Sequence, residues 1–441
     1  MSSQKINEHL EFFEILNRVN CTSIITATSR VRGPLTEAIL EQSLRMTQQR
    51  HPCLNYRIKG SLDNLKLETE GVANIPLHVI SGFHSDHWQD IVLEEVNKKI
   101  DSSQALLRTI LFHPENDTDI SYLITTSHHG ITDALSCFQL HRDILTFCHK
   151  IVSGKPIEIE SFPDLPSSIE ELLPESVKGF RGQLKRLLYI LRFGLKQLRY
   201  RPQTLKFEKC VSPELRHSRF FYRQINEALA QDFVNACKRE GVSMTNAVCA
   251  AMMLSVAKEM KSDMSKPLSM SCWHSINMRK CLEQPVSRER IGIQSSGILS
   301  YHTLRDSTLF WNLAREVKQQ FQDGLMDGNH ISQWLMISKA LAKKVMRNPK
   351  ETEMTILVSN ACVKVPENFG DFLLEDIKMT IGAAGYGTTL SLGMINFGKK
   401  LDLNFFYAEP SISEETVESL ANGVIYYLSE ACKHTLEPVL L

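Results

Sequence analysis

The chain has 441 residues, of which 43% are hydrophobic, so it is long enough to bury a large core or to form two lobes. Lysine plus arginine equals aspartate plus glutamate at 50 each, and this balance predicts no nucleic-acid partner. The start of the chain lacks a signal-peptide pattern, and no apolar run reaches about 18 residues, so we expect a cytoplasmic protein. The 11 cysteines are scattered and never form CxxC, which predicts reduced core thiols rather than disulfides or a zinc cluster.

The N-terminal part of the chain alternates helix and strand patterns. Apolar residues at helical spacing predict a helix over 86–100. Two β-rich runs, 105–112 and 120–127, flank the turn sequence HPENDTD and predict a hairpin. A further helix is expected from Ala134 to about Ile151.

Composition changes near residue 152, where an acidic, proline-containing stretch precedes a basic one. Residues 178–209 contain ten lysines and arginines but one acid, Glu208. Leucines at three- and four-residue spacing predict a basic amphipathic helix here, and they are Leu184, Leu187, Leu188, Leu191, Leu195 and Leu198. We favour a linker helix that packs this leucine stripe on the protein body. The alternative is peripheral contact with a membrane surface or a lipid substrate through 181–200.

The second half of the chain again mixes helix and strand patterns. Its expected helices cover 226–240, 245–260 and a C-terminal segment capped by Ser413, and its expected strands cover 268–278, 354–360, 389–397 and 401–407. Neither half contains a glycine-rich phosphate loop. We therefore expect an α/β (α+β) protein with an N-terminal lobe at 1–177, a linker helix at 178–210 and a C-terminal lobe at 211–441.

The expected strand-to-helix junction carries the segment TTSHHGITDALSCF, Thr125 to Phe138. A histidine four residues before an aspartate is weak evidence alone, because chance predicts about 0.6 such pairs in this composition. The chain has three, but only His129–Asp133 follows a second histidine, His128, for which chance predicts about 0.02. This motif is therefore the strongest candidate site in the sequence.

The residue types of the motif favour acid–base chemistry over metal binding. Adjacent strand residues point to opposite faces, so His128 and His129 do not readily share one ion. No HExxH motif or cysteine partner accompanies them, and we expect no metal. A side chain at a strand end is accessible to substrate, which favours His129 as a general base. A structural role remains open for His128, which we group with His129 and Asp133 as candidate catalytic residues.

The segment SHHGITDA resembles the HHxxxDG signature of the condensation-domain and chloramphenicol-acetyltransferase-like superfamily of acyltransferases. Other segments resemble the family's landmarks in the same order along the chain. These are Arg50–Leu54 (RHPCL), Ala105–Arg108 (ALLR), Ser275–Arg279 (SINMR), Ser359–Asn360 (SN), and Phe397–Leu401 (FGKKL) with Tyr407. The chain is most similar to the stand-alone phthiocerol dimycocerosyl transferase and alcohol acetyltransferase type.

The resemblance implies two chloramphenicol-acetyltransferase-like lobes that form a V, with the catalytic histidine in a central tunnel. It implies that His129 takes the proton of an acceptor as the acceptor attacks a thioester. Asp133 would be structural, with Arg279 as its ion-pair partner. Gly130, Ser359 and Asn360 are the residues expected along the acyl and acceptor tunnel.

The expected activity is therefore transfer of an acyl group to a hydroxyl in secondary metabolism, such as lipid or polyketide biosynthesis. Acyl-CoA or a phosphopantetheinyl carrier protein would be the co-substrate, with no other cofactor and no metal. The alternatives are amide formation with an amine acceptor, or a non-catalytic module that binds a carrier or an acyl chain. Two features depart from the family: Ala134 replaces the motif's final glycine, and the DFGWG element of plant-type relatives is absent.

Overall fold

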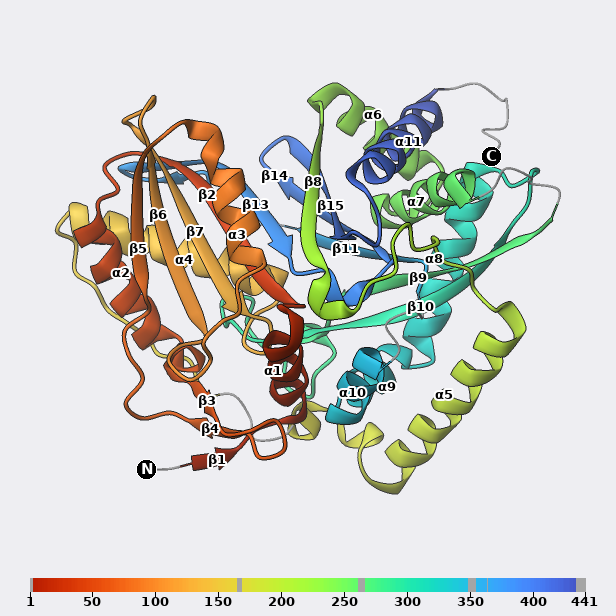
Figure 1. Ribbon diagram of the computed structural model, residues 1–441, viewed down its shortest axis with the longest axis horizontal. Coiled ribbons are helices and arrows are strands. Elements are labelled where there is room, and N and C mark those ends of the chain that lie inside the picture. Colours follow the sequence, from red (N-terminus) through yellow and green to blue (C-terminus); the bar gives the residue numbers. More distant parts are fainter. Residues whose placement is uncertain (1–2, 165–168, 261–265, 348–353, 363, 434–441) are drawn as a thin grey trace.

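The computed structural model describes residues 3–164, 169–260, 266–347, 354–362 and 364–433. Two six-stranded sheets lie side by side, and each carries its own helices, so that the described chain forms two mixed α/β lobes (Figure 1). A small third sheet joins β1 (Ser3–Lys5), β4 (Lys66–Glu68) and β3 (Arg57–Lys59). The expected α/β fold class is confirmed.

The N-terminal sheet is buried on both faces at its centre, whereas its edge strand β5 is partly exposed. Its strand order is β12 (Asn368–Phe369), β13 (Phe372–Ile381), β2 (Ile24–Arg32), β7 (Ile120–His128), β6 (Leu107–Pro114) and β5 (Leu77–Phe83). Leu123 of β7 packs in the cluster that includes residues of α2 (Glu37–Arg50) and α4 (Ala134–Val152), whereas its neighbours Tyr122 and Ile124 pack with α3 (Trp88–Val96). Successive strand residues thus enter opposite hydrophobic layers, which explains why every residue of β7 is buried.

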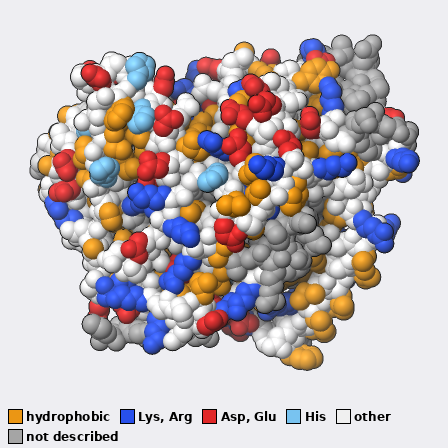
Figure 2. Space-filling model, viewed as in Figure 1, with side chains coloured by type: hydrophobic (Ala, Val, Ile, Leu, Met, Phe, Trp, Pro, Cys, Tyr) orange, Lys and Arg blue, Asp and Glu red, His pale blue; other side chains and the backbone are white. Residues whose placement is uncertain are grey.

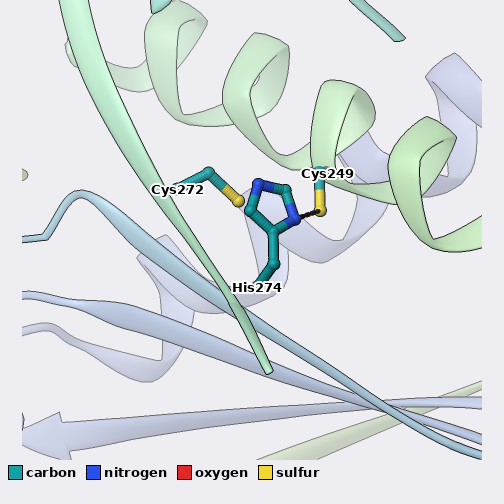
Figure 3. Close-up of side chains that lie close together, drawn as sticks. All are labelled: Cys249, Cys272 and His274. Carbon is teal, nitrogen blue, oxygen red and sulfur yellow. Dashed lines mark hydrogen bonds between the residues drawn. The ribbon is translucent and has the colours of Figure 1, made fainter. Parts of the chain in front are cut away.

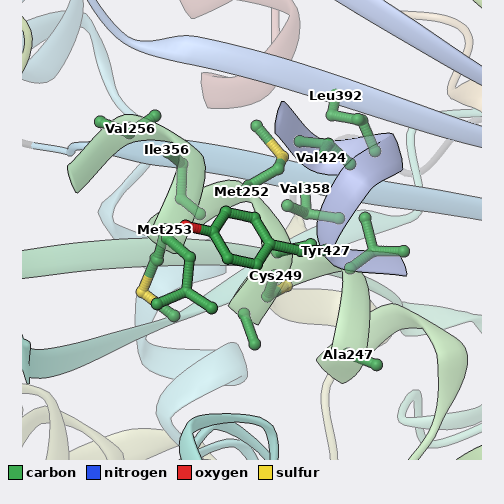
Figure 4. Packing of buried hydrophobic residues seen from close by; sticks show 14 of the residues in the cluster. Ala247, Cys249, Met252, Met253, Val256, Ile356, Val358, Leu392, Val424 and Tyr427 are labelled. Carbon is green, nitrogen blue, oxygen red and sulfur yellow. The ribbon is translucent and has the colours of Figure 1, made fainter. Parts of the chain in front are cut away.

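The C-terminal sheet has the strand order β10 (Ser295–Leu304), β9 (Leu268–Asn277), β11 (Ile356–Cys362), β14 (Leu390–Phe397), β15 (Lys400–Glu409) and β8 (His217–Ile225). Its helices are α6 (Glu227–Arg239), α7 (Met244–Met260), α8 (Phe310–Met326) and α11 (Glu414–Cys432). Helix α7 contacts both the sheet and α11, and is therefore apolar on every side. Figure 4 shows its residues Met252 and Val256 packed with Ile356 and Val358 of the sheet and with Tyr427 of α11.

The two lobes are not contiguous stretches of chain. After β11 the chain leaves the C-terminal sheet, adds β12 and β13 to the N-terminal sheet beside β2, and returns as β14. Residues 368–381 thus pair in the N-terminal sheet, although they lie inside the range 211–441 expected for the C-terminal lobe. At the seam between the sheets, Lys378 of β13 lies 3.3 Å from Asp402 of β15.

The predicted elements are present, with shifts of a few residues at their ends. The clearest shortening is the helix expected over 86–100, whose α-helical part, α3, ends at Val96. The side chain of Asn97 donates to the carbonyl oxygens of Leu93 and Ser218 and accepts from the backbone N–H of Ser218. This contact with β8 of the other lobe stops the helix, and local sequence does not reveal it.

The expected linker helix is α5 (Gly179–Tyr200), but our interpretation of its leucine stripe is wrong. The six leucines named above are 45–69% exposed, so the stripe faces away from the protein body. The aromatic residues Tyr189, Phe193 and Tyr200 are half-buried instead, and they lie on the opposite side of the helix. Amphipathic helices usually bury their apolar stripe against the protein, and this helix does not.

Two further observations concern the chain as a whole. Within the described ranges, no single helix has both the length and the apolar composition to cross a membrane. The pair α6 and α7 meets those two criteria together but is bent by 103°. The described cysteines, most of which are buried, are free thiols.

Candidate active site

The HHGITD motif forms a tight turn between β7 and α4. Strand β7 ends at His128, and Asp133 is the N-cap of α4, where its side chain accepts from the backbone N–H of Ser136. The backbone N–H of Ile131 donates to the His128 carbonyl at 3.0 Å, and the Thr132 hydroxyl donates to the same carbonyl at 3.2 Å. The turn therefore fixes the backbone from which both histidine side chains project.

His129 is held in one orientation and one tautomer. Its Nδ1 lies 2.6 Å from the carbonyl oxygen of Thr132, which accepts only if Nδ1 carries the proton. Nε2 of the neutral ring is then an unprotonated acceptor. The ring of Phe13 packs against the imidazole at 4.4 Å between centroids, with 34° between the planes. The side chain is partly exposed, unlike its neighbours in the motif.

The surroundings of His129 favour its neutral form. Burial lowers the pKa of His129, and the hydrogen bond to the Thr132 carbonyl and the nearby Asp133 charge offset this only in part. The lowered pKa favours the neutral imidazole near neutral pH, with its proton on Nδ1 and Nε2 available to accept a second one. These are the properties required of a general base.

His128 points into the protein and pairs with a buried carboxylate. Its Nδ1 accepts from the backbone N–H of Gly130 at 3.0 Å, so Nε2 carries the ring proton and donates to Glu14 at 3.1 Å. Both side chains are buried, with exposed fractions of 1% and 0%. His128 thus connects the turn to α1 (Glu8–Asn20), which carries Glu14.

Glu14 is the centre of a small polar cluster beneath the turn. It also pairs with Arg18 at 2.5 Å and accepts from the hydroxyl of Ser102 at 2.5 Å. Burial alone would raise the pKa of Glu14, but the hydrogen bond from His128 and the contacts with Ser102 and Arg18 lower it overall. The carboxylate is therefore ionised at neutral pH, with His128, Arg18 and Ser102 as its hydrogen-bond and ion-pair partners.

Asp133 faces away from His129 and joins the two lobes. Its carboxylate accepts from both terminal nitrogens of Arg279, at 2.8 and 3.2 Å, in a buried bidentate ion pair. It also accepts from the backbone N–H and the hydroxyl of Ser136 and from the backbone N–H of Gln294. Burial would raise the pKa of Asp133, yet Arg279 and Ser136 lower it. The predicted Asp133–Arg279 contact is thus present, and the hydrogen bonds of the Asp133 carboxylate go to Arg279, Ser136 and Gln294 rather than to His129.

Gly130 lies in the packed part of the turn. A Cβ atom built there would lie 2.4 Å from Cδ1 of Leu10 and 2.9 Å from Nδ1 of His128. Neither distance is compatible with a side chain, so glycine lets α1 approach the turn closely. The geometry gives Gly130 a packing role, and its place along a tunnel remains a prediction.

The structure does not bring Ser359 and Asn360 into the hydrogen bonds of the motif, among the residues it describes. Both lie on β11, just before the chain crosses to the N-terminal sheet. The Asn360 side chain donates to the hydroxyl of Thr245, at the start of α7, at 2.8 Å. Ala134, the residue in place of the family's glycine, packs its methyl group against the N-terminal hydrophobic cluster.

A separate group of possible metal ligands lies in the core of the C-terminal lobe. Cys249 of α7 and Cys272 and His274 of β9 place their ligand atoms within 4.8 Å of one another (Figure 3). All three are buried, and His274 also bonds the hydroxyl of Ser300 at 2.8 Å. A structural zinc site uses four protein ligands, and a catalytic one uses three with an open position. The trio has the number of ligands of a catalytic site, but all three side chains are buried rather than open to a substrate, and sequence spacing gave no sign of it.

Several partners of the motif escaped the sequence analysis. Glu14 and Phe13 lie more than a hundred residues before the motif, and Gln294 lies in the other lobe, so no local pattern connects them to it. The backbone contact with Ser136 could have been found, because an aspartate at a helix start accepts from the backbone N–H two or three residues later. The motif itself identifies the turn but not its supports.

The C-terminal lobe matches a known family model, that of the phthiocerol/phthiodiolone dimycocerosyl transferase C-terminus, over residues 218–368. A search of curated proteins found no match. Solved structures similar over nearly the whole chain share its fold at low sequence identity.

The first condensation domain of the CDA synthetase aligns with a TM-score of 0.74 and 13% identity, covering 100% of this chain and 99% of that one. A trichothecene 15-O-acetyltransferase from Fusarium sporotrichioides aligns with a TM-score of 0.75 and 12% identity, covering 98% of this chain and 96% of that one. Polyketide synthase associated protein 5 from Mycobacterium tuberculosis aligns with a TM-score of 0.69 and 14% identity, covering 97% of this chain and 100% of that one. The resemblance expected from the motifs is thus confirmed for the fold.

The ion pair between the lobes gives a first prediction. Removing one partner leaves the other charge buried and unpaired, so Asp133→Ala and Arg279→Ala should each lower the free energy of unfolding by about 3–5 kcal/mol. The double variant should lose clearly less unfolding free energy than the sum of the losses of the two single variants, as measured by urea denaturation. The exposed pair Arg315–Glu240 is the matched control, for which coupling should stay below about 1 kcal/mol. Additive losses at Asp133 and Arg279 would contradict the contact.

A second prediction concerns His128. His128→Ala removes the donor to Glu14, but Arg18 and Ser102 still pair with that carboxylate. We therefore expect a loss of about 1–3 kcal/mol in unfolding free energy rather than complete unfolding. Thermal denaturation by circular dichroism measures this, and an unchanged melting temperature would show that the His128–Glu14 contact contributes nothing.

Proposed function

Because the chain has the fold of the condensation-domain and chloramphenicol-acetyltransferase-like superfamily, we propose that it is an acyltransferase. It moves an acyl group from a thioester, carried by CoA or by an acyl carrier protein, to a hydroxyl group. His129 is the general base of this reaction. The observation that carries the proposal is the imidazole of His129, anchored through its Nδ1–H to the Thr132 carbonyl in the turn before α4.

The geometry of His129 supports this role. Its Nδ1–H donates to the Thr132 carbonyl, which leaves the lone pair of Nε2 as the basic position. The packing of Phe13 on the ring limits its rotation, so Nε2 stays in place while substrates enter and leave. Such a positioned base contributes about 10²–10⁴-fold to a rate.

In the proposed reaction, the acceptor hydroxyl gives its proton to Nε2 of His129 as its oxygen attacks the thioester carbonyl carbon. The carbon–oxygen bond forms and the carbonyl π electrons move to oxygen, giving a tetrahedral anion. That anion then collapses, the carbon–sulfur bond breaks, and the departing sulfur takes the proton from Nε2. One ester and one free thiol result, and the imidazole returns to its neutral form.

Asp133 acts in this scheme as a positioning residue. Its five hydrogen bonds go to Arg279, Ser136 and Gln294, so its charge is neutralised before any substrate arrives. It fixes the start of α4 and hence the Thr132 carbonyl that orients His129. The Asp133–Arg279 ion pair therefore influences His129 through the backbone of the turn.

Two points support acyl transfer to oxygen as the leading form of the proposal. A similar structure is that of a trichothecene 15-O-acetyltransferase, named for transfer to oxygen. The family model over 218–368 is that of a dimycocerosyl transferase. An amine acceptor would use the same base and proton path, so amide formation is the nearest alternative. A non-catalytic module would have no need of an anchored imidazole with a free Nε2.

Substitution of His129 tests the proposal. His129→Ala should lower thiol release from acyl-CoA by about 10²-fold or more with the fold intact, because it removes the proton acceptor of the proposed reaction. A thiol-reactive dye measures release with a panel of alcohols and amines, and mass spectrometry identifies the ester or amide. His128→Ala is the matched control and should retain far more activity per folded molecule. Near-normal turnover in folded His129→Ala would show that His129 is not the base.

The pH dependence of the reaction follows from the lowered pKa of His129. The neutral imidazole is the reactive form, so kcat/KM should rise with pH through that pKa and then level off. Since burial lowers the pKa, the rise should lie below the usual imidazole value of about 6.5, and the plateau should extend across neutral pH. A rise centred above about pH 7 would contradict this environment for the base.

A further inference from the structure

Helix α5 exposes more hydrophobic surface than any other part of the described chain. Of the 14 large hydrophobic side chains that are exposed, eight lie on this 22-residue helix. They are Phe180, Leu184, Leu187, Leu188, Ile190, Leu191, Leu195 and Leu198. Hydrophobic side chains accordingly line the lower right edge of the surface in Figure 2, where α5 lies in Figure 1. Scattered apolar residues are normal on a surface, but a contiguous stripe indicates a binding surface.

The residues of α5 sort into three faces around the helix axis. At 3.6 residues per turn, seven of the eight exposed residues, all but Ile190, fall within an arc of about 100°. Tyr189, Phe193 and Tyr200 lie on the opposite side. Lys185, Arg192, Lys196 and Arg199 lie between these faces, along one flank of the leucine stripe.

The aromatic face attaches α5 to the C-terminal lobe. The ring of Tyr200 stacks on that of Tyr301 at 5.3 Å between centroids, and the side chain of Gln333 donates to the Tyr189 hydroxyl. Nζ of Lys196 lies over the Tyr301 ring at 5.9 Å. These contacts hold the helix with its leucines turned outward, so the exposed stripe is fixed by packing on the far side.

Helix α5 is strongly basic. The helix contains six bases and no acid, whereas the whole chain is neutral. Among the described side chains, Lys185, Arg186, Arg192, Lys196 and Arg199 of this helix form no ion pair with an acidic residue. Arg192, Lys196 and Arg199 also line a cavity of about 410 Å³ between α5 and β10, together with Tyr301 and one acidic residue, Asp327. Uncompensated bases beside an apolar stripe indicate a partner that is both apolar and anionic.

We propose that α5 binds the protein to the surface of anionic membranes. The leucine stripe would enter the boundary between head groups and acyl chains, to a depth of about 5–10 Å, and the basic flank would meet lipid phosphates. At 22 residues the helix is about 33 Å long, and it lies along the surface rather than across the bilayer. A second copy of the chain fits less well, because stripe-to-stripe packing would bring the basic flanks of two helices close together. The proposal does not depend on the acyltransferase reaction.

Co-sedimentation with vesicles tests the proposal. The full chain should bind vesicles of phosphatidylcholine mixed with phosphatidylglycerol, bind phosphatidylcholine alone more weakly, and lose the difference at high salt. The triple variant L187Q/L191Q/L195Q should partition at least about tenfold more weakly, because it removes the centre of the stripe. R192Q/R199Q should weaken binding to anionic vesicles about fivefold for each base removed.

Exposed residues elsewhere provide the matched control. Met326 and Tyr426 are 78% and 53% exposed outside α5, so M326Q/Y426Q should bind vesicles as the wild type does. Thermal denaturation checks that every variant folds. Absence of sedimentation with anionic vesicles at low salt would overturn the proposal, as would wild-type binding by the triple variant. Light scattering that shows a dimer dissociated by the triple variant, without vesicle binding, would assign the stripe to a second copy instead.

Discussion

The bidentate ion pair between Asp133 and Arg279 is the interaction on which the site depends. It brings a carboxylate of the N-terminal lobe and a guanidinium of the C-terminal lobe into contact, with both side chains buried. Removing two charges from water is costly, and only near-complete hydrogen bonding offsets that cost. Ser136 and the backbone of Gln294 supply the remaining partners of Asp133. The start of α4 is thus fixed relative to both lobes, and the orientation of His129 follows from it.

Adjacent positions of the motif have opposite environments. His129 is partly exposed and hydrogen-bonded through one nitrogen, whereas His128 is buried and uses both nitrogens, with Gly130 and Glu14. This division follows from strand geometry, because consecutive side chains at the end of β7 leave on opposite sides. Gly130 then allows Leu10 of α1 to close over the turn. One short segment therefore contains a reactive group, its anchor and the joint between lobes.

Much of this arrangement follows from the sequence, and what does not has a common physical cause. Hydrophobic periodicity located the strand before His128 and the helix after Asp133, and the motif's resemblance supplied Arg279. The contacts of Glu14 and Phe13 come from packing between segments far apart in the chain, which no local pattern encodes. The prediction that the leucine stripe of α5 packs on the protein body was wrong for a different reason. Apolar periodicity identifies the hydrophobic face of a helix but does not say whether protein covers it.

The exchange of β12 and β13 into the N-terminal sheet has a consequence for how the molecule is made. Strand β2 lies between β7 and β13, so until residues 368–381 are synthesised it is an unpaired edge in the growing chain. The N-terminal lobe therefore cannot complete its sheet on the ribosome before most of the C-terminal lobe has emerged. For the same reason, the two lobes are not separable pieces. A fragment that stops after α5 would expose the edge of β2 to pairing with other chains.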